Sequence, residues 1–169
     1  MNLLTDKIDE QVFIDALKAC GIVNSSENPR NNQIVIGKQT VQRFNPNIRD
    51  TYIIEKIGEN RQNKNISQGY LIKNVQISLV LCRNDTYSRG LSNSSIENQN
   101  FKNGNNYIDC VKDLENIANK LSNFKLITDN YTIDNIFPYT APELIQAEQG
   151  GFMFSQSYYM TVAYKVAKN

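Results

Sequence analysis

The fold of this chain is most strongly constrained by a long alternation of apolar and polar residues near its carboxyl-terminal end, after Gly150 and Gly151. The apolar residues on one face of the segment 152–166 are Phe152, Phe154, Tyr158, Met160, Val162, Tyr164 and Val166. A period of two is typical of a β-strand with one buried face. At about 3.3 Å per residue, the strand would extend about 50 Å, which is longer than a common strand. We therefore expect it to bend, or to extend past the core of its own domain toward a partner.

A second alternating run, residues 70–82, predicts another strand that lies beside or near the terminal one in the sheet. Shorter β-branched runs predict further strands at residues 33–37, 40–44 and 51–57, and one or two between residues 126 and 137. The polar residues 59–68 are interpreted as a hairpin loop. Residues 144–149 are interpreted as a link to the terminal strand with a helical turn.

Two segments have the apolar spacing of a helix. The first runs to Cys20, with Thr5 or Asp6 as its cap and Gly21 as its stop signal. The second covers residues 107–124, and its apolar stripe is wide enough to cover a sheet face. The stripe consists of Tyr107, Val111, Leu114, Ala118 and Leu121. The polar residues 83–106 between the strand and this helix are interpreted as a long loop.

The order of these elements lacks the regular alternation of a parallel βαβ fold. The sequence therefore predicts an α+β domain, in which a mainly antiparallel β-sheet is packed by an N-terminal helix and one long amphipathic helix. A length of 169 residues suits a single domain, residues 1–169, with a core of its own.

The charge of the chain favours no charged partner. It carries 18 basic and 17 acidic side chains, with a net charge of +1, so no long-range field attracts nucleic acid or an anionic membrane. Acidic residues such as Asp6 and Asp9 near the start argue against a signal peptide, and no apolar run approaches the roughly 18 residues of a membrane span. We expect a protein that stays in a cytoplasm and has no membrane partner.

The sequence offers few groups for catalysis. It contains no histidine, the commonest general base and the partner of nucleophilic serine or cysteine. Cys20, Cys82 and Cys110 are widely separated and are interpreted as buried free thiols. Acidic residues that cluster on the predicted helices are interpreted as solvated faces rather than metal ligands. We therefore predict no catalytic residue, no metal and no cofactor, and a protein that is not an enzyme.

One motif leaves a nucleic-acid alternative open. The segment Gly151-Phe152-Met153-Phe154 is similar to the strand with which RNA-recognition modules stack bases on aromatic rings. However, Gln149 stands where such modules have a basic residue, and no helix follows. Packing of these aromatic side chains against a core is the favoured interpretation.

A mixed group of residues at the predicted exit of the second strand is a candidate partner-binding site. Arg83, Asp85, Tyr87 and Arg89 combine charge with an aromatic ring. Tyr and Arg are enriched in protein interfaces. A solvated loop is the alternative interpretation for each of these residues.

The layout of the whole chain resembles the tail terminator or tail completion proteins of tailed bacteriophages, which lie at the head-tail interface, or neck. The resemblance covers about residues 3–166. It consists of an N-terminal helix, the strand 75–81 followed by Cys82-Arg83-Asn84-Asp85, a loop, the amphipathic helix, a Pro-containing segment, and the turn Glu148-Gln149-Gly150-Gly151 before the aromatic strand.

This resemblance implies a structural virion protein. Such proteins form a ring, most often of six subunits, that caps the tail tube and joins it to the head connector. The expected partners are other copies of the chain, the tail tube protein and the connector or other neck proteins, with DNA only passing through the ring lumen. The protein would be assembled in the host cytoplasm and end in the virion tail. A small phage-encoded protein-binding module, such as a host-factor inhibitor, is the alternative, and a single-stranded nucleic-acid-binding domain is a weaker one.

Overall fold

The computed structural model of the chain describes residues 2–22, 32–37, 48–62, 68–84, 96–122, 124–148 and 151–167. Its elements, in order, are α1 (Asp9–Ala19), β1 (Asn32–Ile36), β2 (Asp50–Gln62), β3 (Tyr70–Asn84), α2 (Ile96–Leu121), β4 (Leu126–Ile127), β5 (Tyr131–Pro138), β6 (Glu143–Glu148) and β7 (Gly151–Lys165). Neither helix in this part of the chain is both long and apolar enough to cross a bilayer.

The strands form one seven-stranded sheet in the order β1-β2-β3-β7-β5-β4, and β6 pairs with β7. The first part of β7 pairs with β6 and its later part with β5, so these two short strands share one edge of β7. All pairs are antiparallel except β1 with β2, which is parallel. The predicted proximity of the two long alternating strands is confirmed, because β3 and β7 pair along their whole lengths.

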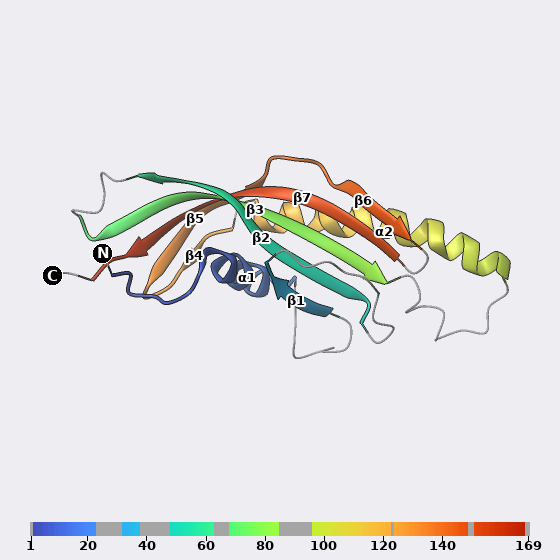
Figure 1. Cartoon of the computed structure of the whole chain (residues 1–169), viewed down its shortest axis with the longest axis horizontal. Coiled ribbons are helices and arrows are strands. Elements are labelled where there is room, and N and C mark those ends of the chain that lie inside the picture. Colours follow the sequence, from blue (N-terminus) through green and yellow to red (C-terminus); the bar gives the residue numbers. More distant parts are fainter. Residues whose placement is uncertain are drawn as a thin grey trace.

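The strand predicted from the alternation near the carboxyl-terminal end is confirmed as β7, and the apolar residues of the alternation form its buried face. Phe154, Tyr158, Met160, Val162 and Tyr164 are all at most 1% exposed, whereas the intervening positions are mostly partly exposed. Figure 1 shows how the sheet accommodates strands of this length, since β2, β3 and β7 curve together in one arch. The expected bend is therefore present.

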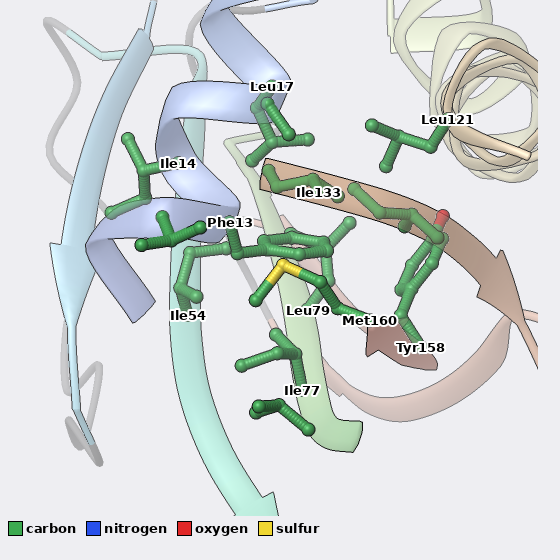
Figure 2. Close-up of a cluster of buried hydrophobic side chains, with 14 of the residues drawn as sticks. Phe13, Ile14, Leu17, Ile54, Ile77, Leu79, Leu121, Ile133, Tyr158 and Met160 are labelled. Carbon is green, nitrogen blue, oxygen red and sulfur yellow. The ribbon is translucent and has the colours of Figure 1, made fainter. Parts of the chain in front are cut away.

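Helix α1 lies under this arch and fills the concave side of the sheet (Figure 1). Figure 2 shows Phe13 of α1 at the centre of the core, where its ring centroid lies 5.5 Å from that of Tyr158. The helix begins at Asp9, after Ile8, so the predicted cap at Thr5 or Asp6 was placed too early. Its predicted stop is correct, because Gly21 adopts a φ of +73° that a side chain would disfavour.

Helix α2 begins at Ile96, well before the predicted start at Tyr107. Part of the predicted loop 83–106 is thus helical, and its first two residues belong to β3. The carboxyl-terminal half of α2 contributes Cys110, Leu114, Ile117, Ala118 and Leu121 to the core. In Figure 1 the amino-terminal end of α2 extends beyond the ends of the strands.

The predicted fold class was wrong. The sequence suggested an α+β domain in which an N-terminal helix and one long amphipathic helix pack an antiparallel sheet. Instead, strands make up most of the described chain and form a curled, half-barrel-like sheet, with two helices as the smaller part. The apolar stripe of the predicted second helix covers only part of the longer helix α2. The strands also extend into polar segments that we predicted to be loops.

Two further predictions fail for the same reason. Strand β2 does not stop at Gly58 but continues to Gln62, through an irregularity in its pairing with β3 between Lys56 and Gly58. Residues 143–148 form β6 rather than a link with a helical turn. Both segments lie at sheet edges, where polar and exposed side chains hide the strand pattern. The predicted strand at residues 40–44 lies outside the described residues.

The segment before α1 returns to the end of β7. The backbone N–H of Leu4 donates to the carbonyl of Lys165 over 3.0 Å, and that of Ala167 donates to the carbonyl of Asn2 over 2.8 Å. Leu3 and Val166 form the bridge between them. The first and last described residues are thus tied together at one end of the sheet.

We expect Phe154→Ala to lower the free energy of unfolding by about 3–5 kcal/mol, because it leaves a cavity in a fully buried position. Denaturant unfolding followed by circular dichroism measures this loss. Ser155→Ala, on the partly exposed opposite face of the same strand, is the control and should change stability by less than about 0.5 kcal/mol. Equal effects of the two substitutions would contradict the assignment of faces.

Candidate functional site

The candidate partner-binding residues do not come together on a described surface. Arg83 lies in β3 and is only 2% exposed. Its position follows the inward alternation of Leu79 and Leu81, so its side chain faces the concave side of the sheet. Asp85, Tyr87 and Arg89 lie outside the described residues.

The buried Arg83 is held by two carboxylates. Its Nε donates to Oδ1 of Asp50 over 2.8 Å and its Nη2 to Oδ2 over 3.1 Å, in a two-point contact between neighbouring strands. Nη2 also donates to Oδ2 of Asp113 on α2 over 2.6 Å. Burial alone would lower the pKa of Arg83, but the hydrogen bonds and charges of these carboxylates outweigh it and raise the pKa above its usual value. Arg83 thus links β2, β3 and α2.

Two cysteine thiols are buried, Cys82 next to Arg83 in β3 and Cys110 in the part of α2 that joins the core. Cys82 and Cys110 are free thiols, and burial raises the pKa of each to about 12. Both therefore stay protonated near neutral pH, in the form that is a poor nucleophile. These thiols pack in the fold without the activation that a reactive cysteine requires.

A second charged group lies where α1 begins and is assembled by the irregularity in β2. Lys56 pairs with Ile77 and Glu59 with Val75, so the extra residue at Ile57 brings Lys56 and Glu59 to the same face of the sheet. Lys73 of β3 lies on that face between Leu71 and Val75. Two lysines and one glutamate are thus directed toward the start of α1.

Asp9, the first residue of α1, is the acceptor for this group, and we call Asp9, Lys56, Glu59, Lys73 and Tyr164 the Asp9 cluster. Lys56 Nζ donates to Asp9 Oδ2 over 2.8 Å and Lys73 Nζ over 3.2 Å, while the hydroxyl of Tyr164 donates to Oδ1. Glu59 Oε2 lies 3.3 Å from Lys56 Nζ and 3.4 Å from Lys73 Nζ. Burial alone would raise the pKa of Asp9, but the bonds from Lys56 and Tyr164 and the charge of Lys73 outweigh it, so this pKa lies below its usual value.

A half-open hollow of about 400 Å³ borders the Asp9 cluster. Its wall consists of residues from the segment before α1, including Leu3 and Thr5, together with Lys56, Lys73 and Tyr164. Both lysine amino groups are already bonded to carboxylates. A ligand in this hollow would therefore have to compete with closed ion pairs, and the arrangement favours a structural role.

The outer face of the sheet carries a group of three aromatic rings, Phe137, Tyr139 and Tyr159, which we call the outer aromatic group. The ring of Tyr159 lies 4.2 Å from that of Tyr139 and 5.5 Å from that of Phe137, between centroids. Phe137 and Tyr139 are both more than a third exposed. Gln76 Nε2 donates to the hydroxyl of Tyr159 over 3.2 Å and orients its ring.

The aromatic rings that were candidates for stacking nucleic-acid bases, Phe152 and Phe154, are not part of the outer aromatic group. Phe152 and Phe154 pack against Tyr107 of α2, with centroid distances of 5.8 and 5.2 Å. Phe154 is almost fully buried, so its face is covered by protein rather than open to a base.

Sequence reasoning overlooked the Asp9 cluster and the partners of Arg83, although a signal was present. Lys73 and Arg83 occupy positions of the apolar alternation in β3, where a charged residue must be buried unless it has a partner. The outer aromatic group gave a weaker signal, because Tyr159 interrupts the polar face of β7 while Tyr139 follows a proline.

No protein-family model matches this sequence, and no curated protein matches it. Within the described ranges, no group of three or more His, Cys, Asp or Glu side chains is placed to hold a metal ion.

Asp9→Asn should lower the free energy of unfolding by about 3–5 kcal/mol at pH 7, because it leaves buried Lys73 without its main counter-charge. The pKa of Asp9 is lower in the fold than the usual value of about 3.9, so the carboxylate stabilises the fold above that pH. The difference from the wild type should shrink as the pH falls below about 4, where Asp9 is protonated in the unfolded chain but still ionised in the fold, and it should disappear only below the lowered pKa of the folded state.

Urea unfolding at several pH values measures this difference. The matched control is Asp6→Asn in the same segment, where the side chain is exposed and the change should stay within about 0.5 kcal/mol. A difference for Asp9→Asn that does not depend on pH would contradict the ionised cluster.

Arg83→Ala should destabilise the fold by about 3–5 kcal/mol, because the carboxylate of Asp50 stays buried and loses both hydrogen bonds from the guanidinium. The double variant with Asp50→Ala should lose less than the sum of the two single losses, since it removes both charges. Thermal unfolding of the four proteins in this cycle measures the coupling. Arg49→Ala, at a half-exposed position near the same carboxylates, should cost no more than about 1 kcal/mol.

Proposed function

We propose that this chain is a structural virion protein, which forms a ring that caps a bacteriophage tail tube and joins it to the head connector. The proposal rests on the resemblance of the chain to tail terminator and tail completion proteins and on the character of the exposed surface. The resemblance implies a ring of six subunits.

The observation that carries the proposal is the set of large apolar side chains that the strands expose at both sides of the sheet. Ile57 of β2 lies on one side, and Leu144 and Ile145 of β6 lie on the other. Exposed apolar residues on opposite sides of one subunit suit repeated contacts with identical neighbours. They also give each subunit two different contact regions, which a ring requires.

The internal chemistry is compatible with this function. The buried charges form two separate groups. Arg83 is paired with carboxylates of β2 and α2, and Asp9 of α1 is bonded to side chains of the three longest strands. They stabilise the positions of the helices on the sheet. A ring subunit that carries mechanical load benefits from elements that are fixed in this way.

A protein-binding module, for example a phage-encoded inhibitor of a host factor, is the second candidate. The outer aromatic group favours this function. Its three rings are neighbours, two of them are partly exposed, and such a group resembles the hot spot of a protein interface. In a ring subunit, the same group is a candidate contact for the tube or connector protein.

Size-exclusion chromatography with light scattering separates these functions. We expect a concentration-dependent ring for the terminator and a stable monomer or dimer for the binding module. We also expect electron micrographs of tails assembled without this protein to show tubes of uncontrolled length. Tails of normal length without it, together with a monomer at all concentrations, would overturn the proposed function.

A further inference from the structure

Part of β2 has an unpaired outer edge. Strand β1 pairs with β2 only from Asp50 to Ile54. Beyond this point, residues 55–62 of β2 pair with β3 on one side and have no strand beside them on the other among the residues that the structure describes. The backbone N–H and C=O groups that point outward from this edge can bond to water or to another strand.

Strand β6 has an unpaired outer edge at the opposite side of the sheet. It pairs with β7 through one edge, and none of the described strands lies along its other edge. Leu144 and Ile145 on this strand are 39% and 55% exposed. An exposed apolar edge strand is a preferred place for the addition of a strand from another chain.

The edges of β1 and β4 are less suited to this role. β4 has only two residues, and β1 has five, whereas the open edge of β2 covers residues 55–62. The edge of β2 also exposes Ile57 at 49%, which gives it an apolar contact comparable to that of β6.

We propose that the outer edge of β2, residues 55–62, of one subunit pairs with the outer edge of β6 of the next subunit, so that the sheets join around the ring. This inference rests on the proposed ring function and names the contact that builds it. The occupant of each edge is a second copy of this chain, because one sheet supplies both edges, on opposite sides and separated by β3 and β7. Each subunit then uses one edge of each kind, as a closed head-to-tail ring requires.

The details of both edges favour a specific neighbour over open-ended stacking. Each strand has an irregular register, between Lys56 and Gly58 in β2 and between Leu144 and Gln146 in β6. Irregular, charged edges resist pairing with an arbitrary strand. Arg61 is half-exposed on β2, where it is paired with Glu59 of its own strand, and Glu143 is exposed on β6, so these two side chains of opposite charge can also meet across the contact.

The test uses two single variants of the full chain, Ile57→Lys and Ile145→Lys, each of which places a charge at an exposed edge position. We expect both to remain folded by circular dichroism and to lose the ring in light scattering. A mixture of the two variants keeps one intact pair of edges, β6 of the first with β2 of the second. The mixture should therefore form heterodimers and stop there.

The matched control is Ile108→Lys on α2, where the side chain is 50% exposed but is not part of a strand, and its rings should be unchanged. If both edge variants form normal rings, the edge contact is overturned while the ring function stands. If each variant loses the ring but the mixture forms no heterodimer, the pairing of β2 with β6 is overturned. A wild-type chain that is monomeric at every concentration would overturn the ring itself.

Discussion

The antiparallel pairing of β3 with β7 decides where the buried side chains of the sheet lie. The two strands match residue by residue from Tyr70 with Lys165 to Asn84 with Gly151. A shift of either strand by one residue would turn the apolar face of that strand toward solvent. The concave core and the place of α1 within it depend on this register, and so does the bond from Tyr164 of β7 to Asp9.

The buried charges act on the neighbouring register, that of β3 with β2, and make it more specific than an apolar face alone would. Lys73 and Arg83 lie ten residues apart on the inner face of β3, and each meets a carboxylate that comes from another element. A slip of β3 against β2 by two residues would keep Arg83 on the inner face but separate it from Asp50, and a buried charge without its partner costs several kcal/mol. The ion pairs therefore penalise wrong pairings, whatever they contribute to the stability of the correct one.

Central strands were predictable from the sequence, and edges were not. The alternation in β7 and β3 reports burial on one face, so both strands and their proximity could be inferred. β6 and the second half of β2 are exposed on more than one side, so their residues follow no period, and they were taken for a link and a loop. The first half of α2 was missed because its sequence is mainly polar and has no apolar stripe. Arg83 was assigned to a surface loop because its partner, Asp50, is distant in sequence and no local pattern joins them.

The bridge between Leu3 and Val166 has a consequence for the connectivity of the chain. Because Asn2 and Ala167 are joined by a backbone hydrogen bond, a short peptide could connect the two ends without disturbing the sheet. New termini could then be opened in a connection between strands, which gives a circular permutant with the same set of strand pairs. In such a protein the order of synthesis would change while the register of β3 with β7 stayed the same, so the contributions of chain order and of side-chain pattern to folding could be separated.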